Sequence, residues 1–401
     1  MTEQANTPVL RFKSFNDEWS LSTIGALGDF YYGKSAPKWS ITEDVGIPCI
    51  RYGELYTKFN NVVNEIYSYT SIPKEKLRFS KGGEILIPRV GEDPLDFAKC
   101  VYLPQKDIAI GEMISVYNTK ENPLFLTYYF NTKMKYEFAK RVEGASVSNL
   151  YYSYLEDIKL KIPDIREQEK LGKFFSKLDQ QIELEEKKLE LLEQQKKGYM
   201  QTIFSQGLRF KDEEGNYYKE WDTKQLKDVL EFSNKKTTNE NEYPVLTSSR
   251  QGLILQSDYY KDGKTFAESN IGYFILPKNY ITYRSRSDDG IFKFNLNQII
   301  DVGIISKYYP VFKGINTNQY YLTLHLNYQL KKEYIKYATG TSQLVLSQKN
   351  LQNIQTKLPS YEEQTKIANF LSKLDKLIEK QSDKVELLKD HKKGLLQKMF
   401  V

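Results

Sequence analysis

One 43-residue segment occurs twice in this chain of 401 residues. Residues 162–204 align with residues 358–400 without a gap, at an offset of 196 positions, and 20 of the 43 positions are identical. The identities include a Phe-x-Ser-Lys-Leu-Asp run and a later Lys-Lys-Gly run in each copy. A period this long exceeds the units of about 50 residues that build solenoid proteins. The sequence therefore predicts two domain-sized halves in tandem, related by a pseudo-two-fold axis.

A shorter repeat opens each half. Leu-Arg-Phe-Lys occurs at Leu10–Lys13 and at Leu208–Lys211, and a Glu-Trp pair follows each copy. Each half thus has an opener, a variable block and a matched helical segment. The expected boundaries are an opener over residues 1–20 that pairs with the C-terminal matched segment, a first variable block over 21–157, a first matched segment over 158–207, a second opener over 208–221, a second variable block over 222–353 and a second matched segment over 354–401.

Both matched segments have the apolar spacing of a long helix. Apolar residues recur at threes, fours and sevens with Lys and Glu between them, which is the heptad pattern of a coiled coil. Pro163 and Pro359 stand just before the pattern, where a helix tolerates proline. Neither helix can bury its stripe alone, so we expect an antiparallel pair about 38 residues and roughly 57 Å long. The residues expected in its seam are Phe174, Leu178, Ile182, Leu189, Leu192, Phe370, Leu374, Ile378, Val385 and Leu388.

Glu185 and Gln381 interrupt the stripe at the same place in both copies. A buried polar pair can fix the register of a coiled coil at some cost in stability. The alternative is that this face of each helix turns outward to solvent. The sequence leaves both interpretations open.

The variable blocks mix short β-branched and aromatic runs with Gly, Asn and Pro, which is typical of strands and loops. Helical stretches over residues 125–141 and 319–336 are expected to close them. The fold class predicted for the whole chain is α+β: two tandem domains of mixed strands and short helices, separated by two long helices packed as an antiparallel coiled coil. The blocks also share landmarks, since residues 47–50 match 243–246, residues 84–89 match 279–284, and residues 114–117 match 305–308.

Charge and aromatic content give a first indication of function. The formal charge is +6, and the chain has 31 Tyr and 21 Phe among its cations. Such a mixture suits a surface that contacts phosphates and bases. Tyrosine is also a good strand former, so composition alone does not separate DNA binding from tyrosine-rich β-structure.

Basic residues at predicted strand ends and in loops are the candidate DNA contacts. Arginine can donate two hydrogen bonds to guanine O6 and N7, whereas lysines are expected to contact phosphates, which position without specifying. Each residue alone is better explained as an ordinary solvated charge, but the set across two matched blocks favours DNA binding. The candidate base readers are Arg51, Arg89, Arg250, Arg284 and Arg286, and the candidate phosphate contacts are Lys34, Lys99, Lys235, Lys236 and Lys293.

The sequence lacks the patterns typical of DNA-modifying or DNA-cleaving enzymes. Its two histidines and two cysteines make no zinc motif, and no glycine-rich loop for ATP or a dinucleotide is present. Asn122–Phe125 resembles an adenine-methyltransferase motif without its second proline. Pro163-Asp164 with Gln168 and Lys170 resembles a nuclease motif, but a helix start explains it better. We therefore expect no catalytic residue and no metal site.

The cellular setting follows from cysteines and hydropathy. Cys49 and Cys100 are expected to be reduced core residues rather than a disulfide. No apolar run nears the roughly 18 residues of a membrane span, and the first residues lack a signal-peptide core. These features predict a cytoplasmic protein that does not associate with a membrane, and the family resemblance given next implies that it is bacterial and associated with DNA.

The duplicated motifs carry a family resemblance. Pro-x-x-x-Glu-Gln-x-Lys followed by Phe-x-Ser-Lys-Leu-Asp begins at Pro163 and again at Pro359, and each half has an opener ending in Glu-Trp. Nearly the whole chain in this way resembles the specificity subunit, HsdS, of type I restriction–modification systems. The resemblance implies that the variable blocks are target-recognition domains, each reading one half of a split double-stranded DNA target. Residues 162–204 and 358–400 would set the spacer and dock two methyltransferase (M) subunits.

The resemblance also assigns the cofactors to other chains. The M subunits would bring S-adenosylmethionine and methylate adenine N6, presenting the base by flipping it. Restriction (R) subunits, in systems that have them, would add ATP- and Mg²⁺-dependent translocation and cleavage. This chain would bind none of these cofactors.

Other protein classes stay open as alternatives. The chief one is a non-enzymatic coiled-coil scaffold whose blocks bind proteins, and its aromatic patches should lack bordering cations. A single-chain restriction enzyme would need cofactor or metal motifs. A transcriptional regulator would more often carry a compact helix-turn-helix.

Overall fold

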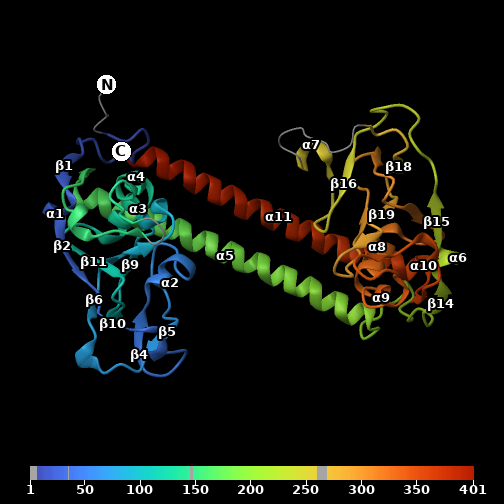
Figure 1. The fold of residues 1–401 in the computed structure, drawn as a ribbon, viewed down its shortest axis with the longest axis horizontal. Helices are drawn as coiled ribbons and strands as arrows, with labels where there is room; N and C mark the ends of the chain where they lie inside the picture. Colours follow the sequence, from blue (N-terminus) through green and yellow to red (C-terminus); the bar gives the residue numbers. More distant parts are fainter. Residues whose placement is uncertain (1–6, 35, 145–147, 260–268) are drawn as a thin grey trace. The chain divides into compact units, whose positions relative to one another are not determined.

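The computed structural model describes residues 7–34, 36–144, 148–259 and 269–401 (Figure 1). The chain divides into two compact units, which we call unit 1 (residues 1–188 and 381–401) and unit 2 (residues 189–380). Each unit contains one variable block and one part of each of two long helices, α5 (Ile165–Phe204) and α11 (Tyr361–Met399). The predicted α+β class with two tandem blocks and two long helices is confirmed.

Unit 1 is built on a four-stranded antiparallel sheet in the order β2-β11-β7-β9. A five-stranded sheet, β3-β5-β4-β10-β6, adjoins it, and its β4 and β10 are parallel. Two-stranded ribbons join β1 to β13 and β8 to β12. The strands are β1 (Ser20–Thr23), β2 (Gly28–Tyr32), β3 (Ile41–Thr42), β4 (Ile47–Ile50), β5 (Ser68–Thr70), β6 (Phe79–Lys81), β7 (Glu84–Pro88), β8 (Val90–Gly91), β9 (Val101–Leu103), β10 (Lys106–Ile110), β11 (Ile114–Thr119), β12 (Ser148–Asn149) and β13 (Lys159–Ile162).

Unit 2 repeats the central sheet as β15-β23-β19-β21. Ribbons β14-β25 and β20-β24 correspond to β1-β13 and β8-β12, while β16-β17 and β18-β22 replace the five-stranded sheet. The strands are β14 (Asp222–Gln225), β15 (Leu230–Ser233), β16 (Leu246–Ser248), β17 (Leu253–Leu255), β18 (Phe274–Pro277), β19 (Ile281–Tyr283), β20 (Arg286–Ser287), β21 (Phe294–Leu296), β22 (Val302–Ile305), β23 (Val311–Gly314), β24 (Leu344–Val345) and β25 (Gln355–Leu358).

The helical stretch predicted to close each block is two helices in each case. Asparagine caps the first: Asn122 Oδ1 accepts from Phe125 N at 2.8 Å, and Asn318 Oδ1 from Tyr321 N at 3.1 Å. The first block's helix ends early because the chain turns at Met134, and this packs Phe138 back against Phe130 in the core. The short helices are α1 (Ile24–Leu27), α2 (Tyr52–Thr57), α3 (Pro123–Lys133), α4 (Lys135–Ala139), α6 (Leu226–Val229), α7 (Gln256–Tyr259), α8 (Gln319–Tyr328), α9 (Tyr334–Tyr337) and α10 (Gln348–Gln352).

Two of the predicted landmark matches between the blocks are wrong. Residues 114–117 lie in β11, whereas residues 305–308 end β22 and enter the following turn, so the counterpart of β11 is β23. Residues 84–89 do match the region of β19, but one position away from the sequence alignment. Leu150 N donates to Arg89 O and Leu346 N to Ser285 O, each at 2.9 Å, which makes Ser285 the counterpart of Arg89.

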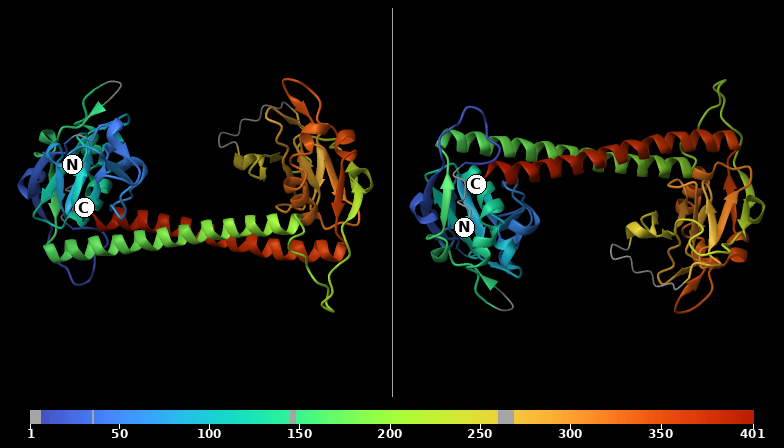
Figure 2. Two further views of the ribbon diagram at one scale, coloured as in Figure 1. Left: turned by 90° about the horizontal axis from the view of Figure 1, so that it is seen from below. Right: turned by 90° about the horizontal axis from the view of Figure 1, so that it is seen from above.

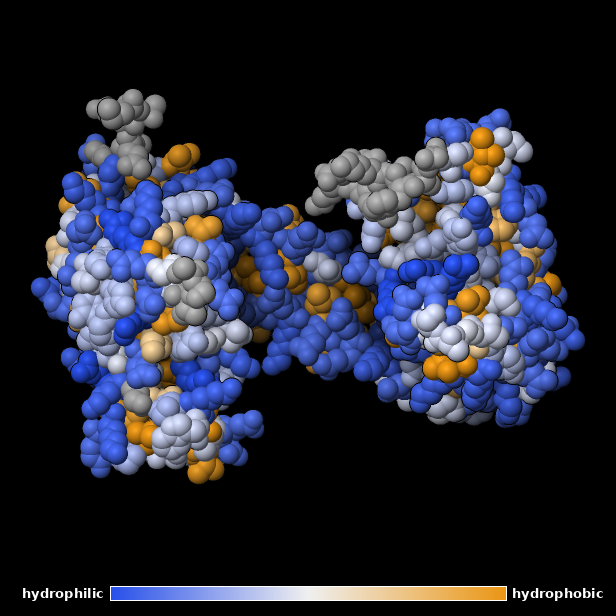
Figure 3. All heavy atoms as spheres, viewed as in Figure 1, coloured by the Kyte–Doolittle hydropathy of each residue, from blue (hydrophilic) through white to orange (hydrophobic). Residues whose placement is uncertain are grey.

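The two long helices run side by side in opposite directions within each unit (Figure 2). In unit 1, Lys392 of α11 pairs with Asp179 of α5; in unit 2, Lys196 of α5 pairs with Asp375 of α11. Of the predicted seam residues, Ile182, Leu374 and Val385 are buried and the other seven are half-buried. Figure 3 shows apolar surface exposed along these helices among the charged residues.

The opener that begins each half packs on the helix ends of its unit. In unit 1, Leu10 N donates to Lys398 O at 2.9 Å, and Phe12 meets Phe174 edge-on at 5.7 Å. In unit 2, Leu208 N donates to Thr202 O at 3.0 Å. Thr202 and Lys398 are 196 positions apart, so the two hydrogen bonds are counterparts.

Candidate DNA-binding surfaces

Three predicted contacts of unit 1 meet at the turn, residues 111–113, that links β10 to β11. Lys34 N donates to Ile110 O at 2.8 Å, Arg89 N donates to Met113 O at 3.0 Å, and Gly111 N donates to the carbonyl just before Arg51 at 2.9 Å. The backbones approach closely, since a Cβ on Gly33 would lie 2.0 Å from the Gly111 oxygen. Strand ends that are far apart in sequence thus bring the backbones of Lys34, Arg51 and Arg89 together at this turn, and we call the region the turn surface of unit 1.

Arg78 belongs to this surface and was missed in the sequence. Its Nη1 donates to Tyr32 O at 2.8 Å, its guanidinium lies 5.5 Å from the Tyr31 ring, and its own carbonyl accepts from Ile110 N at 2.9 Å. The residue precedes β6 rather than following a strand, so the strand-end pattern could not find it. The tyrosine to which it donates lies 46 positions away in the chain, so no local signal marks it.

Unit 2 presents its cations differently. Arg286 lies 5.4 Å from the Tyr308 ring, and Ser285 Oγ donates to Tyr308 O at 3.0 Å. Arg284 is exposed on the same loop. Lys235 and Lys236 are also exposed, and Lys236 lies 5.0 Å from the Phe274 ring.

Arg250 is less available than the sequence suggested. Its Nη2 donates to both carboxylate oxygens of Asp289 at 2.7 Å, and Ser287 Oγ donates to the same carboxylate at 2.9 Å. These bonds, led by that from Ser287, lower the pKa of Asp289. Nη2 of Arg250 would have to leave this carboxylate before it could donate to a base.

Lys99 and Lys293 lie beside the long helices. Burial, together with nearby Lys392, lowers the pKa of Lys99; burial, together with nearby Lys196 and Lys331, lowers that of Lys293, although much of its side chain is exposed. Lys196 and Lys392 are counterparts, so each block places one lysine by the same helix position.

The repeated Asp and Lys of the matched segments form a polar joint in each unit. In unit 1, Asp179 accepts from Tyr128 Oη at 2.6 Å and Asn61 Nδ2 at 2.9 Å and pairs with Lys392. In unit 2, Asp375 accepts from Tyr320 Oη and pairs with Lys196. The repeated residues therefore tie each block to both helices.

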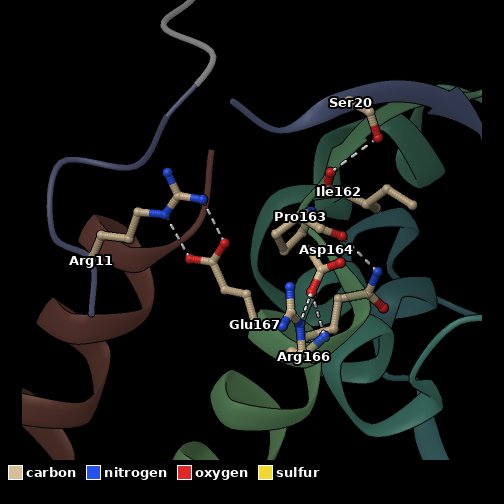
Figure 4. A network of polar contacts seen from close by, with 8 residues as sticks. Arg11, Ser20, Ile162, Pro163, Asp164, Arg166 and Glu167 are labelled. Atoms are coloured by element: carbon tan, nitrogen blue, oxygen red, sulfur yellow. Dashed lines mark hydrogen bonds and ion pairs between the residues drawn. The ribbon is translucent and has the colours of Figure 1, made fainter. Parts of the chain in front are cut away.

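The repeated Glu of the matched segments holds the opener (Figure 4). Arg11 donates from Nε and Nη2 to the Glu167 carboxylate at 2.7 and 2.6 Å, and only 1% of the Glu167 side chain is exposed. Arg209 makes the same two-bond contact with Glu363 at 2.8 and 3.1 Å. The tryptophans of the two Glu-Trp pairs differ in their hydrogen bonding. Trp221 Nε1 donates to Glu363 at 3.2 Å, while Trp19 Nε1 is buried without a partner among the described residues.

The interrupted position of the helix stripe is a contact between the helices. Gln381 Nε2 donates to the Glu185 carbonyl at 2.9 Å and to its carboxylate at 2.7 Å, and Lys384 Nζ donates to the same carboxylate at 2.5 Å. The bond from Gln381 is the main reason that the pKa of Glu185 is lowered. The pair therefore fixes the register of the helices, and the outward-facing alternative is wrong.

Catalytic and metal-binding arrangements are not apparent in the described ranges. No group of three or more His, Cys, Asp or Glu there could hold a metal ion. Cys49 and Cys100 are free and buried, as predicted. The two motifs that resemble enzyme motifs are linked by a hydrogen bond, in which Gln168 Oε1 accepts from Asn122 N at 3.0 Å. Within its own motif, Gln168 Nε2 donates to Pro163 O at 2.9 Å.

Comparison with known proteins gives this architecture its identity. The model of the type I restriction modification DNA specificity domain matches residues 16–194 and again residues 218–387. The chain belongs to this type I specificity family. The double match reproduces the internal repeat.

Named relatives and a solved structure agree with the specificity family. The type I restriction enzyme MjaVIII specificity subunit of Methanocaldococcus jannaschii is 27% identical over 320 residues, 73% of each chain. A putative MjaX specificity subunit from the same organism is 25% identical over 293 residues, 67% of this chain and 65% of that protein. The type I S subunit of M. genitalium shares the fold with a TM-score of 0.62 at 16% identity, over 98% of this chain and 99% of that one.

Membership of the specificity family confirms that the chain recognises DNA and supplies no catalysis of its own. The predicted base and phosphate contacts remain predictions, residue by residue. In the described part of the chain, no helix is long and apolar enough to cross a membrane.

Proposed function

We propose that unit 1 and unit 2 each read one half of a split double-stranded DNA target, while α5 and α11 set the spacer and dock two M subunits. The observation that carries this is the duplicated block, which keeps the same central sheet but presents different cations in each unit. A shared scaffold with different reading residues suits two unlike half-sites. S-adenosylmethionine, and ATP with Mg²⁺ where R subunits join, would be bound by the partner subunits.

The direct experiment is co-expression with a candidate M subunit, followed by methylome sequencing of the host. We expect a bipartite N6-methyladenine motif that disappears when this chain is deleted. An unchanged set of methylated motifs after deletion would contradict the proposal.

Exposed leucines on the long helices are the proposed M-docking residues. Leu184 and Leu387 are 69% and 70% exposed. They lie at one level of the helix pair in unit 1, because Glu185 contacts Lys384 and Glu186 contacts Lys389. In unit 2, Leu191, the counterpart of Leu387, and Leu377 are exposed as well. Exposed apolar side chains on otherwise charged helices are typical of a protein interface.

We expect Leu184→Glu with Leu387→Glu to weaken M binding at least about 100-fold, or about 3 kcal/mol, since two buried leucines contribute that much. Calorimetric titration with purified M subunit measures it. Gln180→Glu with Lys376→Glu adds negative charge at two exposed counterpart positions and should leave the affinity unchanged. Equal losses in both variants would show a general charge effect instead of apolar docking.

Helix length should set the spacer, because α5 and α11 are each continuous from one unit into the other. Three extra heptads in each helix, between Lys188 and Leu189 and between Lys380 and Gln381, preserve the heptad register and add about 31 Å. That is close to one turn of DNA, about 34–36 Å. We expect the methylome to show both half-sites unchanged and a spacer longer by roughly nine base pairs. A change in the bases would mean that the helices do more than space the readers.

A further inference from the structure

The guanidinium of Arg89 lies over two tyrosine rings, and we call this arrangement the clamp. Its guanidinium carbon lies 4.7 Å from the Tyr32 ring centre and 5.1 Å from that of Tyr151. The backbone is tied on both sides, since Arg89 N donates to Met113 O and Arg89 O accepts from Leu150 N. Arginine normally loses about 2 kcal/mol of side-chain entropy when it is immobilised. Here the fold has already imposed most of that loss.

The donors of this clamped guanidinium are unused within the described residues. Its Nε is buried and has no hydrogen-bond partner there, and no carboxylate there pairs with it. Arg78, by contrast, donates to Tyr32 O, and Arg250 is bound to Asp289. A buried donor without an acceptor costs about 1–3 kcal/mol. The Nη atoms of Arg89 are not among the buried atoms without a partner in the described residues, so an incoming acceptor reaches the guanidinium at its Nη end.

The clamp also restricts where an acceptor can approach. The N–H groups of a guanidinium point outward in its own plane, so a ring over its face leaves them free to donate to a ligand at the edge. Two adjacent acceptors in one plane are the matching chemistry, and guanine offers them as O6 and N7 in the major groove. Phosphate oxygens accept bidentate hydrogen bonds too, but the exposed Lys34 is the predicted phosphate contact of this surface.

Among the described residues, the unit 2 counterparts of two clamp residues are serines. The counterpart of Arg89 is Ser285, and the counterpart of Tyr151, which follows Leu150, is Ser347, which follows Leu346. Ser347 caps α10, where its Oγ accepts from Asn350 N at 3.1 Å. The two units share a scaffold but have different residues at this position. Such a difference is expected where two units recognise different DNA sequences.

We propose that Arg89 is a specificity-determining residue that donates a bidentate pair of hydrogen bonds to a guanine in the half-site of unit 1. Tyr32 and Tyr151 are positioning residues that hold its plane. This inference rests on the proposed function, because it requires unit 1 to read one half-site.

The test uses the complex of the full chain with its M subunit. The wild-type methylome first defines the motif, and fluorescence anisotropy then measures binding to a duplex that carries it. In separate duplexes, 7-deazaguanine, which lacks the N7 acceptor, replaces each guanine of the unit 1 half-site in turn. We expect one replacement to weaken wild-type binding about 5- to 100-fold, the range of one bidentate base contact.

Arg89→Ala should show a loss of the same size on the natural duplex and no further loss with 7-deazaguanine at that position. In the methylome it should relax that position alone and leave the unit 2 half-site unchanged. Arg89→Lys should not restore discrimination, because an ammonium lacks the planar fork. Tyr32→Leu with Tyr151→Leu should weaken the same contact without shifting the preference to another position.

Several outcomes would overturn the inference. A unit 1 half-site without a G·C pair would overturn it. So would an Arg89→Ala variant that weakens binding to all duplexes equally and makes the affinity depend less steeply on salt, because that is the signature of a phosphate contact. Loss of fold in Arg89→Ala would leave the 7-deazaguanine series on the wild type as the deciding measurement, and no sensitive position there would reject the contact. A wild-type complex with no bipartite motif would instead refute the proposed function.

Discussion

Replacing Arg11 with methionine is expected to lower the free energy of unfolding of unit 1 by about 3–5 kcal/mol. The Glu167 carboxylate is almost fully enclosed and receives both hydrogen bonds of this arginine. Methionine fills similar space but leaves the charge buried without a partner, and this is costly in a medium of low dielectric. Urea unfolding followed by Trp19 fluorescence, with Trp39 and Trp221 changed to phenylalanine, reports on unit 1.

Two controls separate this effect from a general loss of charge. Arg166 pairs with Asp164 close to the same site (Figure 4), but its side chain is 82% exposed, so Arg166→Met should leave the urea midpoint unchanged. Arg11→Met with Glu167→Gln should recover much of the loss, because the neutral amide needs no counter-ion. If the double variant is no more stable than Arg11→Met alone, the cost does not come from the buried charge.

Acid is expected to destabilise unit 2 through His325. This side chain is fully buried, its Nε2 lies 2.6 Å from Thr356 Oγ1, and burial lowers its pKa to about 3. The unfolded chain protonates near pH 6.5, whereas the folded chain holds the neutral ring. The associated stability is therefore present above about pH 6.5 and is lost as the pH falls toward 3. The loss should reach about 2 kcal/mol at pH 5 and about 5 kcal/mol at full titration.

Urea unfolding at pH 7.5 and pH 5, followed by Trp221 with the other two tryptophans changed to phenylalanine, measures the effect. His325→Gln keeps a polar group for Thr356 but does not titrate, so its stability should change little between these pH values. In unit 1, Tyr129 contacts Phe400 as His325 contacts Phe204, and burial raises its pKa to about 12. The unfolding of unit 1, followed by Trp19 fluorescence, is thus an internal control. If the stability of unit 2 in His325→Gln depends on pH as it does in the wild type, the effect does not come from His325.

The sequence predicted the long helices well because their information is local and periodic. Heptads and the preceding prolines placed them within a few residues of Ile165–Phe204 and Tyr361–Met399. The repeated polar residues were also visible in the sequence, but the contacts that they make were not. That Asp179 meets Lys392, and Glu167 meets Arg11, depends on antiparallel helices and on an opener that folds back from a distant part of the chain.

The reading surfaces were predicted less well because strand pairing decides them. Local resemblance aligned Arg89 with Arg284, whereas the ribbon hydrogen bonds align it with Ser285. In the sequence Lys99 resembles an ordinary basic residue of a loop, but its block packs on α11 and brings Lys99 near Lys392. Nothing in the neighbouring residues signals either outcome.

The backbone hydrogen bonds of the two openers bear on chain topology. Leu208 reaches Thr202 through a few covalently linked residues, and Leu10 reaches Lys398 with the same bond but no peptide link between them. The same local geometry thus forms with and without a covalent connection. A circular permutant that opens the chain between Ser205 and Gly207 and joins Val401 to the first opener would keep these contacts. The order of the two variable blocks along the polypeptide is then decided by the position of the chain ends and not by the fold.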